Sequence, residues 1–197
     1  MSNQKTTPPP VRATLTREDW IAAAQRILIK NGIDTVRVDS LAKELNITRG
    51  SFYYHFKSRE DLLLSLLANW RSQSTENIIL QLGSAHYSPT ERLALLLELP
   101  FKGNKAREAA AVEIAIRGWA RRDPLARQAM DEVDSHRLAY IESLLAQMSY
   151  SSEQAKDTAT LIYAYQLSIS IIRPDTPYEE RYAQHLRIIK QWLPADN

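Results

Sequence analysis

Apolar residues recur along this chain at the spacing of amphipathic helices, and no stretch alternates apolar and polar residues as a strand does. Val38, Leu41, Ala42 and Leu45 occupy positions i, i+3, i+4 and i+7, so they share one helix face. The pattern predicts an all-α fold of about nine helices without internal repeats. The predicted helices cover residues 16–31, 38–45, 49–56, 58–82, 89–99, 104–122, 124–148, 151–172 and a last segment from 177 onward.

Helix boundaries are marked by residues that can cap a first turn or end a last one. Gly32 and Gly83 stand where the first and fourth helices should end. The candidate N-terminal caps are Thr16 with Asp19, Ser58 with Asp61, Asp123 before Pro124, Ser151 with Gln154, and Thr176 with Pro177 and Glu179. Residues 58–82 are therefore predicted to form one long helix that connects the first three helices to the rest of the chain.

A short turn, residues 46–48, separates the second predicted helix from the third. Asn46 tolerates the left-handed backbone that such a turn requires, and Thr48 stands where its hydroxyl can cap the next helix. Phe52 and Phe56 lie four residues apart and can both point inward. Helix, short turn and helix form a geometry in which the second helix can enter the major groove of DNA.

The outward side of the 49–56 helix has the chemistry that a DNA-reading helix needs. No Asp or Glu occurs in residues 45–59, so the negative charge of a duplex would not be repelled there. Arg49 and Ser51 can bond base edges, and Gly50 lets the backbone come close. Donors suited to phosphate oxygens are Tyr53, Tyr54, His55, Lys57 and Arg59. Alternatively, the three aromatic residues 53–55 could form a half-buried cluster in a helical protein that does not bind nucleic acid.

The segment LAKELNITRGSFYYHFKSREDLL, residues 41–63, resembles the DNA-binding signature of the TetR/AcrR (tetracycline-repressor-like) family of bacterial regulators. The run of residues 53–57 is the most specific part of the resemblance. This resemblance implies a DNA-binding set of Arg37, Thr48, Arg49, Gly50, Ser51, Tyr53, Tyr54, His55 and Lys57. The chain departs from the family pattern in having Asn46 where Gly is common and Arg37 where Thr is common. An arginine at the latter position could keep a phosphate contact.

The resemblance also implies that the head is followed by a larger helical domain that binds a small-molecule effector. We therefore expect a flexible tail at residues 1–15, a helix-turn-helix DNA-binding domain at 16–60, and an effector-binding and dimerisation domain at 61–197. Candidate ligand contacts are Trp70, Trp119, Tyr163 and Gln166, although such residues commonly serve only as core. Glu113 and Arg117 are expected to pair on the surface, four residues apart on one helix.

The last two predicted helices carry more apolar surface than one domain would be expected to cover. The two apolar sets are Ala155, Ala159, Ile162, Tyr163, Gln166, Leu167, Ile169 and Ile172, and Tyr178, Tyr182, His185, Leu186, Ile189, Trp192 and Leu193. By the resemblance, a two-fold partner covers them in a four-helix bundle, giving a homodimer suited to paired half-sites. The alternative is that both sets are buried within one monomer.

Composition and charge narrow the possible functions. Residues 1–60 hold 10 Lys or Arg against 6 Asp or Glu, a net charge of +4, whereas residues 61–197 hold 15 against 17, a net charge of −2. A basic front suits DNA binding at one end of the chain. The absence of Cys excludes disulfides and thiolate sites and fits the cytoplasm. No apolar run reaches membrane-spanning length, and residues 1–15 lack the core of a signal peptide.

Catalysis has little support in the sequence. The four His residues are scattered, and neither a GxSxG motif nor a Gly-rich phosphate loop occurs, so no catalytic residue, metal site or cofactor is predicted. Asp131, Glu132 and Asp134 are expected to form a solvated acidic face. We predict a ligand-responsive, sequence-specific transcriptional regulator, a repressor that a small molecule releases from a palindromic operator. The alternative is a protein of the same fold that docks a protein partner without binding DNA.

Overall fold

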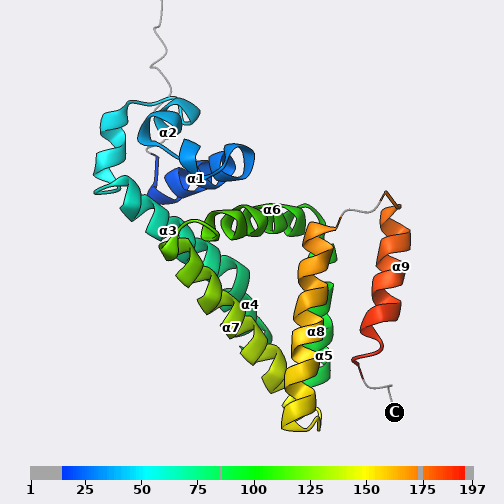
Figure 1. The fold of residues 1–197 in the computed structure, drawn as a ribbon. Coiled ribbons are helices and arrows are strands. Elements are labelled where there is room, and N and C mark those ends of the chain that lie inside the picture. The colour runs from blue at the N-terminus through cyan, green and yellow to red at the C-terminus, as the bar shows by residue number, and fades with distance from the viewer. Residues whose placement is uncertain (1–14, 85, 173–174, 194–197) are drawn as a thin grey trace, which may run out of the picture.

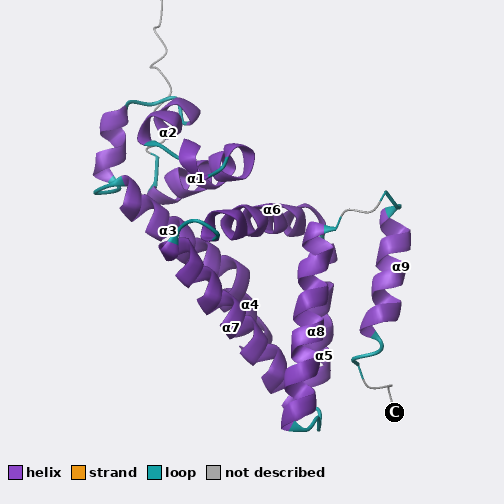
Figure 2. Ribbon diagram, in the orientation of Figure 1, coloured by secondary structure: helices purple, strands orange, loops and turns teal. Residues whose placement is uncertain are grey.

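The computed structural model describes residues 15–84, 86–172 and 175–193, and within these ranges it contains nine α-helices and no strand (Figure 1, Figure 2). They are α1 (Arg17–Asn31), α2 (Val38–Glu44), α3 (Arg59–Arg71), α4 (Asn77–Ser84), α5 (Pro89–Glu98), α6 (Gly103–Ala120), α7 (Pro124–Gln147), α8 (Ser152–Ile171) and α9 (Tyr178–Ile189). The predicted all-α fold is confirmed. The predicted tail, residues 1–15, lies outside the described residues except for its last residue.

Most of the predicted N-terminal caps are present. The hydroxyls of Thr16, Ser58 and Ser151 accept hydrogen bonds from the backbone N–H three residues later, and the Asp123 carboxylate accepts two at the start of α7. The start of α9 differs from the prediction, because Pro177 occupies the cap position and no side chain caps the helix. Thr176 lies one residue too early to serve as that cap.

A head formed by α1, α2 and the short helix Arg49–Tyr54 stands at one end of the molecule (Figure 1). Trp20 of α1 is fully buried and meets the edge of Phe52 with ring centroids 5.3 Å apart. Phe56 stacks on Phe52 at 5.4 Å. Burying each of these side chains contributes about 1.5–3 kcal/mol, so the three rings hold the head together. The predicted inward positions of Phe52 and Phe56 are confirmed.

The long connecting helix is interrupted, contrary to the prediction of one unbroken helix over residues 58–82. A π turn, Ser72–Glu76, separates α3 from α4, although the two segments continue in one direction (Figure 1). A π turn widens the helix by one residue and frees backbone groups to bond with side chains from elsewhere. Periodicity cannot reveal it, because the apolar stripe continues on both sides.

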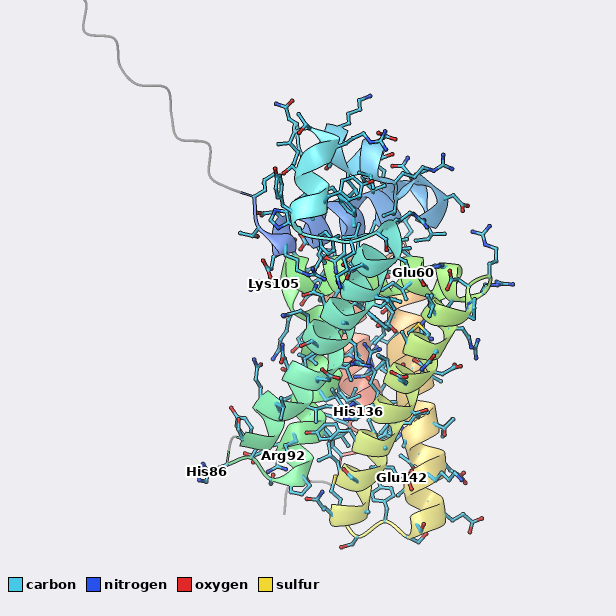
Figure 3. All side chains as sticks on the ribbon, turned by 90° about the vertical axis from the view of Figure 1, so that its left-hand side faces the viewer. Glu60, His86, Arg92, Lys105, His136 and Glu142 are labelled. Carbon is cyan, nitrogen blue, oxygen red and sulfur yellow. The ribbon has the colours of Figure 1, made fainter. Side chains whose placement is uncertain are left out.

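The larger domain packs α7 against α6 and α8, with α5 also against α7, and α6 lies under the head beside α1 (Figure 1). In Figure 3, Glu60 lies at the head end of α3, while Arg92 and Glu142 lie near the opposite end of the molecule. One apolar core runs from Trp20 in the head through Leu66 of α3 to Ile116 of α6. The head is therefore packed directly against α6 as well as joined to the rest through α3.

Candidate nucleic-acid interface and cavity

The turn before the short helix is built as predicted at Asn46, whose backbone φ of 53° is left-handed. The next element differs. Residues Arg49–Tyr54 form a 3₁₀ helix rather than an α-helix, and its first bond joins the Ser51 N–H to the Thr48 carbonyl at 3.1 Å. The Thr48 hydroxyl makes no capping bond, so the predicted cap is wrong. In this tight helix the first hydrogen bond is accepted by the backbone carbonyl of Thr48 and not by its hydroxyl. The Thr48 side chain is exposed.

The outward aromatic residues do not form the half-buried cluster that was the alternative. Tyr53 is 58% exposed and Tyr54 88% exposed, whereas Phe52 beside them is fully buried. His55 is half-buried, with its ring 6.3 Å from that of Trp20. Two tyrosine hydroxyls are therefore available on the outer face of the head, next to exposed Lys57.

Arginines in the head differ in how much of their bonding capacity is free. Arg49 is exposed and pairs with Asp39 of α2 at 3.0 Å. Arg37 donates from Nε to the carbonyl of Asp34 at 2.8 Å, and this bond leaves its two outer guanidinium nitrogens for another partner. Arg59 donates to the Val36 and Ile33 carbonyls at 2.6 and 2.9 Å. Arg59 thus braces the loop between α1 and α2, and its role as a phosphate contact stays a prediction.

Arg17 is a positioning residue that the sequence did not reveal. Its guanidinium donates to the His55 carbonyl at 2.5 Å, to Asp61 at 3.2 Å and to Ser65 at 2.6 Å. It also lies 4.2 Å above the Phe56 ring. These partners are 38 to 48 residues away in the chain, so no local pattern could show them.

Asp61 fixes the loop between the 3₁₀ helix and α3. Its carboxylate accepts from the Lys57 N–H at 2.9 Å, and this backbone bond, together with that from Arg17, lowers the pKa of Asp61. The chain just after the outward tyrosines is consequently held to both α1 and α3.

A cavity of about 580 Å³ lies in the larger domain among α4, α6, α7 and α8. Trp70, Tyr163 and Gln166 line it, as the sequence suggested for a ligand site. Trp119 does not line it. Trp119 is buried where α6 meets α1 and lines a separate hollow of about 430 Å³ there. The apolar ring of Trp119 faces apolar residues of α1, so it helps to pack the head against α6.

One wall of the cavity carries a network of charged side chains. Glu113 accepts from Arg117 at 2.9 Å and from Arg137 at 2.9 Å. Arg117 also donates to Asp134 at 2.7 Å, and the Tyr163 hydroxyl donates to the same carboxylate oxygen at 2.5 Å. The predicted pairing of Glu113 with Arg117 is confirmed, but its predicted place on the surface is wrong, because α7 and α8 pack over the two side chains. Asp134 likewise faces inward, unlike its predicted solvated neighbours Asp131 and Glu132.

The network perturbs the pKa values of its members in the directions that burial and pairing require. Burial raises the pKa of Tyr163 to about 12. Burial alone would lower the pKa of Arg117 and Arg137, but the neighbouring carboxylates of Asp134 and Glu113 outweigh it, and both pKa values are raised. Both guanidinium groups therefore stay protonated near neutral pH, and the Tyr163 phenol stays neutral.

Arg137 joins this network to the π turn in the connecting helix. Its Nε donates to the hydroxyl of buried Thr75 at 2.9 Å, and its Nη2 donates to the Ser74 carbonyl at 3.2 Å. The same guanidinium reaches Glu113 through Nη1. A single side chain thus contacts both the cavity wall and the irregular point of the helix that leads to the head.

The last two helices divide their apolar residues between inside and outside. His185 and Ile189 of α9 are buried, and the Tyr165 hydroxyl lies 3.0 Å from His185 Nδ1. In contrast, Leu161 of α8 is 61% exposed, and Ile171 and Ile172 at its end are each 62% exposed. Of the two predicted apolar sets, the monomer therefore leaves Ile172 and Tyr178 exposed, and Leu161 and Ile171, which lie outside those sets, add to the uncovered apolar surface.

Among the described residues, no three His, Cys, Asp or Glu side chains gather closely enough to hold a metal ion. No helix in the described ranges is both long and apolar enough to cross a membrane.

Comparison with known sequences places the head in a family. The sequence model described as "Bacterial regulatory proteins, tetR family" matches residues 21–66. HTH-type transcriptional regulator EthR of Mycolicibacterium smegmatis is 45% identical over 47 residues, 24% of this chain and 22% of that relative. Such matches cover about a quarter of the length of the curated relatives. The sequence similarity is therefore concentrated in the head.

Solved structures extend the likeness to the whole fold. A transcriptional regulator from Saccharomonospora viridis in complex with choline has a TM-score of 0.73 at 20% identity, covering 88% of this chain and 95% of that one. Transcriptional regulator FadR from Bacillus subtilis, in complex with stearoyl-CoA, has a TM-score of 0.66 at 18% identity, covering 92% and 100%. At these identities the likeness concerns the fold alone. The match to the tetR-family model is thus confined to the helix-turn-helix head, and the arrangement of the remaining helices is similar to that of these solved regulators.

Proposed function

We propose that this protein is a ligand-responsive, sequence-specific DNA-binding regulator of transcription, acting as a repressor that a small molecule releases from a palindromic operator. The observation that carries the proposal is the outer face of the 3₁₀ helix. This face contains no Asp or Glu and exposes tyrosine hydroxyls and cationic side chains. Phe52 and Phe56 are buried on the opposite side and anchor the helix to the head. Such a face matches the donors that a phosphate backbone and base edges accept.

In this proposal Arg49 and Ser51 reach base edges, and Gly50 permits close approach. The Arg49–Asp39 pair must open for this, but pairs this exposed are worth about 0–1 kcal/mol, so duplex DNA can compete for the arginine. The proposed phosphate or sugar contacts are Arg37, Thr48, Tyr53, Tyr54, His55 and Lys57.

The proposed assembly is a homodimer through α8 and α9. The exposed apolar residues of α8 supply a surface for a second copy, and a two-fold pair of heads would read two half-sites spaced by whole turns of DNA. A monomer that covers only part of this surface fits such a partner better than it fits an isolated chain.

The proposed effector site is the cavity lined by Trp70, Tyr163 and Gln166. Its volume lies within the usual range of about 300–1,000 Å³ for small-molecule sites. The solved relatives with choline and stearoyl-CoA show that ligands accompany this fold in other proteins. Arg137 is the proposed link to the heads, because it holds the π turn from the cavity side. Ligand would change the spacing of the heads through α3 and α4.

Selection of bound duplexes from a random pool with purified protein, followed by sequencing, tests the proposal. An enriched inverted repeat is expected from wild type, and Arg49→Ala should weaken or broaden the enrichment. A steep loss of affinity with salt should accompany it. Absence of enrichment at low salt, with wild type and Arg49→Ala alike, would instead favour the protein-docking alternative, provided that protein refolded to remove any co-purified ligand behaves the same.

A further inference from the structure

The charges that line the cavity cancel, and this property bears on which ligands it accepts. The inference that follows rests on the proposed effector site and deepens it. Four lining residues are charged: Lys105, Glu108, Glu113 and Arg137. Lys105 and Glu108 are exposed on α6 at the rim, whereas the Glu113 and Arg137 side chains are only 13% and 17% exposed. The inner wall therefore contains one acid and one base.

The inner acid and base are each paired with protein groups. Both carboxylate oxygens of Glu113 accept from arginine, and all three guanidinium nitrogens of Arg137 donate to protein. Behind them Arg117 and Asp134 form a second balanced pair. Each charge in this wall is therefore already balanced by a protein group of opposite charge.

A charged ligand would therefore enter without compensation. An ion that leaves water needs an opposite charge or several hydrogen bonds in return, and it otherwise loses several kcal/mol of solvation. An uncharged ligand loses little solvation and leaves the network intact. The rest of the lining suits such a molecule, since it is largely apolar and includes Ile78, Ile79, Leu96, Val112, Ile141 and Leu167.

Gln166 supplies a neutral hydrogen-bonding group at this apolar part. Its Nε2 donates to the Leu96 carbonyl at 3.0 Å, which orients the amide. Within the described part of the chain, its amide oxygen receives no hydrogen bond from another residue. An amide in this state can accept from a hydroxyl or an N–H group on a ligand.

We propose that the effector is an uncharged, largely apolar organic molecule with a hydroxyl or similar hydrogen-bonding group, and that Glu113 and Arg137 set this charge selectivity. The two residues act as a matched pair. Removing either charge leaves the wall with an unbalanced charge of the opposite sign, which should redirect the preference toward a ligand ion that balances it.

The first test uses three ligands with one carbon skeleton: 2-naphthylmethanol, 2-naphthoate and 2-naphthylmethylammonium. Titration calorimetry with full-length protein at pH 7.5 should show that the alcohol binds at least about tenfold more tightly than either ion, a difference of about 1.4 kcal/mol. Equal or tighter binding by an ion overturns the proposal. Failure of the alcohol to bind also overturns it, because the cavity is large and apolar enough for that ring.

The second test is a switch of preference. Glu113→Gln should raise the affinity for naphthoate relative to the alcohol by about tenfold, and Arg137→Met should do the same for the ammonium ligand. The double variant Glu113→Gln with Arg137→Gln restores balance and should restore preference for the alcohol. Glu108→Gln at the exposed rim is the matched control and should change the ratio by less than about twofold, because solvent screens it.

Circular dichroism and thermal unfolding confirm that each variant is folded before titration. If a single variant does not fold, the wild-type series and the double variant still decide the proposal. Folded variants that all keep the wild-type order of ligands overturn the role of Glu113 and Arg137. Calorimetry needs no DNA, so failure of operator selection would contradict the proposed function without altering this result.

Discussion

The head and the larger domain use charged residues in opposite ways. In the head, Arg49 and its partner Asp39 are 62% and 69% exposed, so both are open to solvent. In the larger domain, Arg137 and Glu113 are 17% and 13% exposed and depend on each other and on neighbouring polar groups. Exposed charges remain free to meet another molecule, whereas buried ones must have fixed partners. The charged groups on the face proposed for DNA can therefore bind another molecule, whereas those in the cavity wall are already paired with each other.

The same contrast appears among the aromatic residues of the head. Phe52 and Tyr54 lie two residues apart, yet the first is fully buried and the second 88% exposed. A large side chain at the first position therefore supports the fold, and one at the second is available for contact.

Phe52→Ala should destabilise the head by about 3–5 kcal/mol, because it removes a buried ring that touches both Trp20 and Phe56. Urea unfolding followed by circular dichroism measures the free energy of unfolding. Tyr54→Ala is the matched control and should change it by less than about 0.5 kcal/mol. A similar loss from both variants would show that the outer face also holds the fold together.

Arg49→Ala should relax base preference at one operator position by about 1–3 kcal/mol, whereas Lys57→Ala should weaken binding to all sequences alike. Binding to the selected operator and to single-base variants of it, measured over a range of salt concentrations, separates the two effects. Lys57→Ala should also reduce the slope of log affinity against log salt by about one. Equal behaviour of the two variants would contradict their proposed division into base and phosphate contacts.

Double-mutant cycles can compare an exposed ion pair of the head with a partly buried ion pair beside the cavity. The Arg49–Asp39 pair should contribute a coupling energy of about 0–1 kcal/mol to stability. Arg117–Asp134, with two parallel bonds and about a quarter of each side chain exposed, should contribute more, on the order of 1–3 kcal/mol. Alanine substitutions made singly and together, with unfolding free energies as the readout, provide both values. Coupling as strong in the head as in the cavity would remove the distinction.

Acidification should lower stability modestly through His185. Burial among Phe101, Tyr165 and Tyr182 lowers the pKa of this His below its ordinary value of 6.5, while Glu98 opposes the shift. The folded state thus binds the proton less readily than the unfolded chain. Its contribution to stability is complete above pH 6.5, falls as the pH drops toward the folded-state pKa, and is constant below that value.

Thermal unfolding between pH 7.5 and pH 5 measures this dependence. His185→Gln should flatten the curve over that interval, although it also lowers stability at every pH. An unchanged slope in the variant would assign the pH dependence to other groups. His86, on an exposed segment, is the control position, and His86→Gln should leave the slope intact.

Several features of the head could be predicted from its residues because they depend on interactions that are short in sequence. Asn46 turns the chain, Ser58 caps α3, and Phe52 with Phe56 repeats at helical spacing, all within one or two turns. The family resemblance at residues 41–63 draws on the same local pattern. Even here the sequence misjudged Thr48, since whether a short helix is α or 3₁₀ depends on the packing behind it.

In the larger domain, several interactions could not be predicted from local sequence patterns. Its helices followed from apolar periodicity, and three of the four candidate ligand residues that the family resemblance implied line the cavity. The π turn, the inward network and the bonds of Arg137 did not, because they join positions tens of residues apart. The sequence alone determined which segments are helical and which face of the head is free of acid. Only the tertiary structure decided which charges are buried together, since burial depends on the elements that pack over a side chain and not on its neighbours in the chain.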